Sequence, residues 1–177
     1  TDFFSFMDCW TPMIFASLSV AVALKPGLFH IGVSGQMLAA GFITTITVGY
    51  STLSAPIAKP LVILVAAVVG ALVGGLIGFL KYRFNINEVV SSIMLNYIIE
   101  YVVGFFINTR YVNPISRQSQ TVSSEARLTL SGTKIGDLKF DIPLGLILAV
   151  IVVIIVKYIF DRTVLGYELK AVGSNQK

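Results

Sequence analysis

The stretch PLVILVAAVVGALVGGLIGFLKYRFNINEVVSSIMLNYIIEYVVGFFIN, from Pro60 to Asn108, decides the fold. Its first part, Leu61 to Leu80, carries no charge over about twenty residues, the length that a helix needs to cross a bilayer. Lys81-Tyr82-Arg83 then ends the apolar run as an interfacial anchor. Asn85 is the expected N-cap of a second apolar helix, with Glu88 as its capping-box partner. The stretch therefore predicts two membrane-spanning helices joined by a short charged turn.

Small residues recur every four positions along the first of these helices. Helices in lipid associate largely through close packing over small side chains. We expect this stripe to be a helix-packing face, formed by Ala66, Gly70, Gly74 and Gly78.

The composition excludes several other classes of protein. Hydrophobic residues make up 55% of the 177 residues and charged residues only 12%, whereas soluble domains carry about 25% charged residues. The net charge of +4 comes from cations at the edges of apolar segments and in loops, so no nucleic-acid partner is expected. One cysteine and one histidine do not form an internal disulfide or a multi-histidine metal centre. The sequence predicts an all-α polytopic membrane protein without a cofactor or metal.

Residues 11–50 contain two short apolar pieces, Thr11–Leu24 and Gln36–Tyr50, on either side of Lys25-Pro26-Gly27. Such a pair can be a discontinuous or re-entrant element, or two short spans joined by an ordinary tight turn. Both interpretations stay open. Together with spans at 60–80, 88–108 and 142–160, this gives about five membrane segments.

Residues 109–140 form the longest polar stretch and are expected to be an external loop. Ser131-Gly132 is a weak hairpin signal within it. Asp141-Ile142-Pro143 is expected to cap the last span. The tail, residues 163–177, is too short and polar to cross a membrane, and we expect a helix capped by Thr163 and ended by Gly173.

The charge distribution sets the topology. Lys81 and Arg83 lie in one short loop, and Lys157, Arg162 and Lys170 surround the last segment. Two spans separate these places, so they share a side, which the positive-inside rule makes cytoplasmic. The chain starts at Thr1 without an initiator Met and ends at Lys177, so it is expected to be a piece of a longer polypeptide.

Three stretches resemble the permease subunits of bacterial ABC importers for simple sugars, nucleosides and branched-chain amino acids. They are GLFHIGVSGQM (27–37), GFLK through NEVVSSIMLNY (78–97) and TVLGYELKAVGSN (163–175). Within the second stretch, the motif IMLNY (93–97) is most similar to the nucleoside branch of this family. His30 and Ser34 depart from the family pattern, which has Asn and Glu there.

The resemblance implies a multi-pass subunit of the bacterial plasma membrane that forms half of a pathway for a nucleoside or simple sugar. It implies an ATP-binding subunit, a second permease subunit in a homo- or heterodimer, and an extracellular substrate-binding lipoprotein as partners. ATP hydrolysis is expected on the ATP-binding partner, since this chain has no phosphate-loop motif; the chain itself is not expected to be an enzyme. The cytoplasmic coupling helix would use Leu165, Gly166, Glu168, Leu169, Ala171, Gly173 and Asn175. Resting on lipid is the other possibility for this amphipathic segment.

Glu100 and Asn96 lie one turn apart within an apolar span. A carboxylate at membrane depth costs several kcal/mol unless it is paired or wetted. The pair could line the substrate path, with His30 and Gln36 as further candidates, or could join helices by hydrogen bonds. An ion-coupled secondary transporter, with Glu100 as proton carrier, is the alternative function; an intramembrane enzyme fits less well, because the chain has few catalytic groups.

Overall fold

A computed structural model describes residues 2–112, 118–123, 126–135 and 138–174. The chain divides into two compact units. One consists of His30–Arg127, and the other combines Thr1–Phe29 with Leu128–Lys177.

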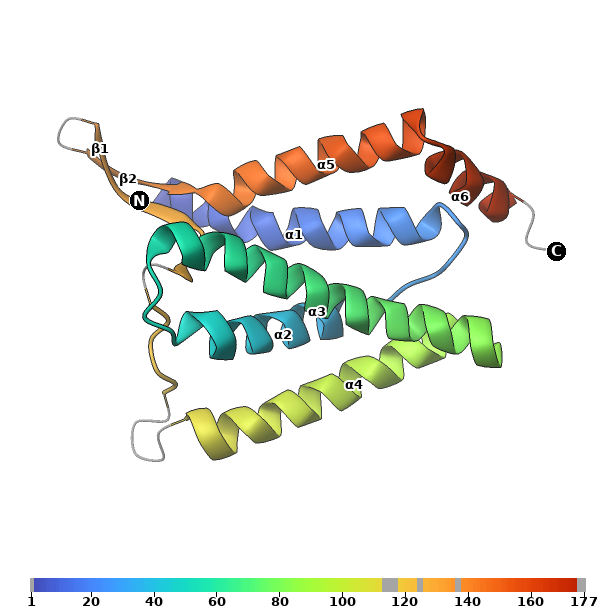
Figure 1. The fold of residues 1–177 in the computed structure, drawn as a ribbon, viewed down its shortest axis with the longest axis horizontal. Coiled ribbons are helices and arrows are strands. Elements are labelled where there is room, and N and C mark those ends of the chain that lie inside the picture. Colours follow the sequence, from blue (N-terminus) through green and yellow to red (C-terminus); the bar gives the residue numbers. More distant parts are fainter. Residues whose placement is uncertain (1, 113–117, 124–125, 136–137, 175–177) are drawn as a thin grey trace. The chain divides into compact units, whose positions relative to one another are not determined.

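The unit His30–Arg127 is a set of three packed helices. Helix α2 (Val33–Thr44) packs against both α3 (Ala55–Phe84) and α4 (Glu88–Phe106), and the three lie side by side in Figure 1. Helix α2 continues into a π-helical turn, η1 (Thr45–Gly49), and α4 continues into another, η2 (Ile107–Tyr111). A small core of Val48, Ala58 and Ala126 closes one end of this unit.

The other unit pairs the first and last long helices. Helix α1 (Asp2–Leu24) packs along α5 (Leu144–Arg162), and the short helix α6 (Val164–Ser174) follows at the end of α5 (Figure 1). Strands β1 (Thr129–Ile135) and β2 (Leu138–Pro143) form an antiparallel hairpin before α5.

Three helical segments of the described residues are long and apolar enough to cross a membrane: Ala55–Phe84, Glu88–Tyr111 and Leu144–Arg162. Cys9–Leu24 and Val33–Gly49 are shorter apolar helices. At most 17% of the most apolar window of each long segment is buried within the chain. Apolar surface of that extent requires lipid or further protein around it. The prediction of a helical multi-pass membrane protein is confirmed.

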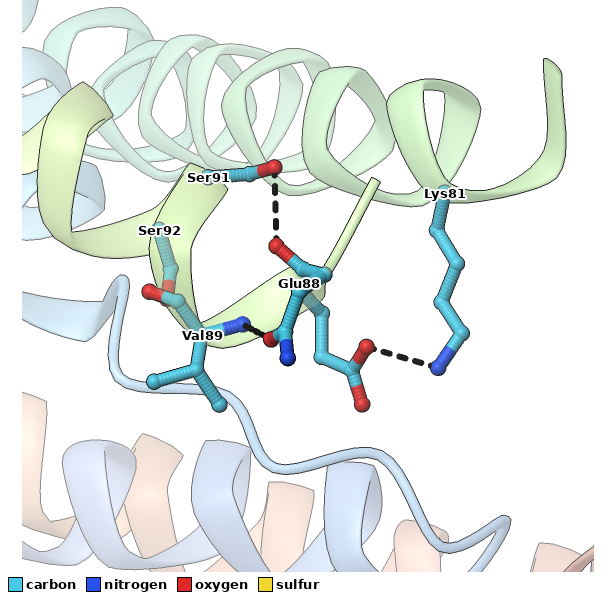
Figure 2. A network of polar contacts seen from close by, with 6 residues as sticks. Lys81, Glu88, Val89, Ser91 and Ser92 are labelled. Carbon is cyan, nitrogen blue, oxygen red and sulfur yellow. Dashed lines mark hydrogen bonds and ion pairs between the residues drawn. The ribbon is translucent and has the colours of Figure 1, made fainter. Parts of the chain in front are cut away.

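The turn between α3 and α4 differs from the sequence prediction. Asn85 ends α3 in the left-handed conformation (φ 53°), and the N-cap of α4 is Asn87, whose side chain accepts a hydrogen bond of 2.9 Å from the Val89 N–H. Glu88 pairs with Lys81 at 2.7 Å (Figure 2). The predicted capping box at Asn85 was therefore wrong. Asn tolerates the left-handed region, so a residue type that caps helices also suits a position that ends one.

The start of the last helix also differs from its prediction. Pro143 ends β2, and α5 begins at Leu144, so Asp141-Ile142-Pro143 is strand and not a cap. The hairpin itself is present, but Ser131-Gly132 lies inside β1, where the pairing register shifts between Leu130 and Thr133. The link between the strands, residues 136–137, lies outside the described residues.

Helix α1 is longer than the apolar piece that predicted it. It runs from Asp2 and contains Pro12, so polar and aromatic residues before Thr11 extend the helix. The break after it includes Gly27, whose φ of 78° suits glycine. Helices α1 and α2 belong to different units. The two alternatives for residues 11–50, a re-entrant pair or two short spans joined by a tight turn, therefore both stay open.

Candidate functional site

Asn96 of α4 holds the start of α2. Its Oδ1 accepts a hydrogen bond of 3.0 Å from the Gly35 N–H, and its Nδ2 donates one of 3.0 Å to the Ile31 carbonyl. The N-cap residue of α2, Gly32, has no side chain to satisfy the first N–H groups. Asn96 thus caps α2 from another helix, and an amide suits the position because it is both donor and acceptor.

Gly35 permits this approach. A Cβ on Gly35 would lie 2.5 Å from Oδ1 of Asn96 and 3.1 Å from its Cα. Every other residue type would push α4 away from the start of α2.

Gln36 makes the corresponding contact between α2 and α3. A Cβ on Gly74 would lie 2.5 Å from Nε2 of Gln36. Gly70 and Gly78 have open space at this position. Ala66 lines a small cavity facing α2. Among the described residues, the stripe of small residues thus meets α2 at Gly74 and Ala66, and packing through Gly70 and Gly78 stays a prediction.

His30 and Glu100 lie in different surroundings. His30 folds back over Gly32, where an added Cβ would meet its Cε1 at 2.6 Å and Ile77 Cδ1 at 2.9 Å. Glu100 is exposed on α4 and has no hydrogen bond or ion pair with the described residues. The structure therefore brings His30, Gln36 and Asn96 together around the start of α2, and Glu100 stands apart from them.

An aromatic cavity near the other end of α2 was missed by the sequence analysis. It has a volume of about 260 Å³ and is lined by Phe42, Tyr50 and Tyr111, among others. The Phe42 and Tyr111 rings meet edge to face at 5.9 Å, and those of Tyr50 and Tyr111 are nearly parallel at 6.1 Å. The sequence signal for it was a tyrosine near the end of two apolar segments, Tyr50 after residues 36–49 and Tyr111 after residues 88–108.

Helix α6 turns sharply from α5. The Oγ1 of Thr163 accepts a hydrogen bond of 3.3 Å from the Gly166 N–H, which confirms the predicted N-cap. Gly166 is buried, and a Cβ there would lie against the Ile159 carbonyl and 2.5 Å from Phe160 Cα. The helix ends at Ser174, one residue beyond the predicted Gly173.

The far end of α6 is also in close contact. A Cβ on Gly173 would collide with the Lys25 carbonyl. Lys170 pairs with Asp161 at 3.3 Å. Asn175 lies outside the described residues. One side of α6 therefore rests on α5 and on the segment after α1.

The opposite side of α6 is open and partly apolar. Val164 is 72% exposed, Leu165 64%, Tyr167 74% and Val172 56%, and Leu169 is the least exposed of its large apolar residues at 36%. Glu168 and Ala171 are exposed as well. Such a cluster of exposed apolar side chains on a short helix is typical of a surface that contacts another protein or a membrane.

The comparisons with known proteins agree with this architecture. Residues 4–177 match the model of a family described as branched-chain amino acid transport system / permease component. The chain belongs to this family. It is accordingly a multi-pass protein of the plasma membrane and a transport component.

Three relatives extend this result. A nucleoside ABC transporter permease protein of Lactococcus lactis is 36% identical over 93% of the chain. A guanosine ABC transporter permease protein of Bacillus subtilis is 34% identical over 94%, and a glucose ABC transporter permease protein of Haloferax volcanii is 31% identical over 94%. The chain spans about half the length of these relatives, 46% or 47% in each case. No solved structure gave a significant match.

Proposed function

We propose that this chain is part of the permease of an ATP-driven ABC importer, in which it lines the path of a nucleoside. Family membership and the nucleoside and guanosine relatives support this proposal. The observation that carries it is α6, a short helix with an open apolar side, held at both ends by glycines in close contact.

The open side of α6 is the proposed docking surface for the ATP-binding subunit. A short helix inserts its apolar residues into a groove of its partner. Its inner side carries Gly166 and Gly173, so a force on α6 reaches α5 and the segment at Lys25 directly. Glu168 lies exposed beside the apolar residues and suits a polar contact at the rim.

Replacing one exposed tyrosine tests this docking. Tyr167→Ala removes a 74% exposed ring from α6, and Tyr82→Ala removes a 90% exposed ring from the last turn of α3, which has the same proposed cytoplasmic location. An interface hot spot contributes about 2 kcal/mol or more. We expect Tyr167→Ala to weaken binding of the ATP-binding subunit at least about tenfold, and Tyr82→Ala to leave it unchanged. Equal binding by both variants, measured with detergent-solubilised importer, contradicts the docking surface.

Coupling is a separate measurement. We expect Glu168 and Gly173 variants that insert normally to hydrolyse ATP without matching uptake. Full coupled uptake by both variants contradicts the assignment of α6 as the coupling helix.

For the substrate path, we propose that Glu100 faces it. An unpaired carboxylate within a span does not face lipid, and the second half of the permease or the water-filled path can cover it. Asn96, Gln36 and His30 then position the start of α2 beside the path. Glu100→Gln keeps the shape and removes the charge, and we expect it to change the uptake rate with normal insertion and ATPase binding.

A second permease subunit and an extracellular substrate-binding lipoprotein complete the proposed importer. The ion-coupled alternative is tested with the same preparation. Uptake by an ABC importer stops with vanadate and persists with a protonophore, and the opposite result favours proton coupling through Glu100.

A further inference from the structure

The aromatic cavity of the unit His30–Arg127 has the form of a ligand site. Its rings come from three places in the sequence: Phe42 in α2, Tyr50 after η1, and Tyr111 at the end of η2. All three are only partly exposed, and the cavity floor includes the buried Val103. The Tyr111 ring packs against the rings of both Phe42 and Tyr50, so the three rings form one cluster in the cavity lining.

Two π-helical turns, η1 and η2, set the orientation of Tyr50 and Tyr111. The Tyr50 N–H bonds to the Thr45 carbonyl at 3.0 Å, and the Val112 N–H bonds to the Ile107 carbonyl at 3.0 Å. Each bond spans five residues instead of four, so the chain after it is turned by about 100° relative to a regular α-helix. Single π-helical turns occur frequently at functional sites. Here both occur in one unit, and each precedes or contains a tyrosine of the same cavity.

The chemistry of the lining is aromatic and hydroxylic. Besides the three rings, the hydroxyl residues Thr45 and Ser119 line the cavity, and none of the described residues that line it is charged. Aromatic rings stack on any nucleobase, with about 1–3 kcal/mol per base. An uncharged lining does not compensate a phosphate. A neutral nucleoside therefore fits the lining better than a nucleotide.

The dimensions agree with this ligand. Pockets for drug-sized ligands measure about 300–1,000 Å³, and this cavity, at about 260 Å³, suits a smaller molecule. A base between two rings needs two van der Waals contacts, or about 7 Å. The centroids of the nearly parallel rings of Tyr50 and Tyr111 are 6.1 Å apart, which is the spacing of two rings paired with each other, so a base enters by separating the two rings or by stacking on a free ring face.

We propose that the cavity between Phe42, Tyr50 and Tyr111 is a nucleoside-binding site, in which the base stacks on the tyrosines and the hydroxyl groups hydrogen-bond to the ligand. The proposal rests on the proposed function. It extends that function because Glu100 lies seven residues before Ile107 of the cavity on one continuous helical segment. Residues seven apart share a side of a helix, so the site and the carboxylate follow one another along α4.

An aromatic belt at the membrane surface is the other role such rings have. Belt residues point individually towards lipid headgroups. Phe105 of α4 is 64% exposed, packs against Phe106 and has no place in the cavity. It provides a matched control on the same helix.

The experiment uses the complete importer in proteoliposomes, with 8-azidoguanosine as photoprobe and guanosine as competitor. We expect labelling of the wild type in the peptide that contains Tyr111. Tyr50→Leu and Tyr111→Leu should reduce competable labelling about tenfold, Tyr111→Phe less than about threefold, and Phe105→Leu not at all. Retained ATPase binding shows that the variants are folded.

Two results overturn the site. If the wild type takes up guanosine and the Tyr→Leu variants are labelled like the wild type, the site is wrong and the proposed function stands. If the wild type takes up glucose and no nucleoside, both the site and the proposed function are wrong, because the substrate then has no base to stack on the tyrosines.

Discussion

Replacing Asn96 is expected to loosen the start of α2 by a calculable amount. Asn96→Leu removes a hydrogen bond of 3.0 Å to the Gly35 N–H and another of 3.0 Å to the Ile31 carbonyl. Hydrogen bonds between membrane helices average about 0.6 kcal/mol, whereas a buried group left without a partner costs about 1–3 kcal/mol. Gly35 is buried and Ile31 is exposed, so the full cost applies only to Gly35. The expected loss is about 1–3 kcal/mol.

Amide hydrogen exchange at Gly35 measures this loss locally. Since about 1.4 kcal/mol corresponds to a tenfold change, exchange should accelerate about 5- to 150-fold. Asn96→Asp keeps the acceptor for Gly35 and loses the donor for Ile31, so it should have a smaller effect at Gly35 than Asn96→Leu. Asn108→Leu is the control, because among the described residues the Asn108 side chain donates its one hydrogen bond, of 2.8 Å, to the Gly104 carbonyl of the same helical segment.

The reasoning is refuted by either of two results. The first is exchange at Gly35 in Asn96→Leu within twofold of the wild type. The second is equal acceleration by Asn108→Leu, which would show that any polar loss from α4 has the same effect.

Five further substitutions test the contacts elsewhere. Gly74→Leu should lower the melting temperature of the solubilised protein because its side chain displaces Gln36, whereas Gly70→Leu, which enters open space, should not. Asn87→Ala should cost about 1 kcal/mol as the loss of an N-cap, and Asn85→Gly should be neutral or stabilising since φ is positive there; equal effects of both in chemical denaturation would contradict the capping assignment. Lys170→Ala, which breaks an ion pair between two exposed groups, should leave the melting temperature within about 2 °C.

Local sequence patterns predict the apolar helices well and their ends less well. The long uncharged run of α3 has one stable arrangement in a bilayer, the helix, because every backbone group must be bonded internally. The turn after it contains Asn85 and Asn87, and both are good N-cap residues. Only the backbone conformation distinguishes them, and it depends on how α3 and α4 meet. The same limit applies at Pro143, where pairing in the hairpin overrides the helix-start signal.

The candidate site depends on contacts between distant residues, which a single sequence does not contain. Asn96 is a conspicuous polar residue in an apolar span, but its partners Ile31 and Gly35 lie 65 and 61 residues away. The aromatic cavity is less predictable still. Tyr50 and Tyr111 are brought together by π-helical turns, which change the helical period that a sequence analysis assumes.

The close contacts of α6 support its proposed role as a coupling helix. A helix of eleven residues is marginal by itself, and resting on lipid would leave it free to tilt. Here Gly166 lies against the Ile159 carbonyl and Gly173 against the Lys25 carbonyl. Side chains at these two positions would act as flexible spacers. Direct contact between backbones does not let α6 shift relative to α5 or to the segment at Lys25. In the proposed importer, displacement of the open apolar side by a partner would therefore move α5 and the segment after α1 together, and that segment continues along the chain to the start of α2 that Asn96 holds.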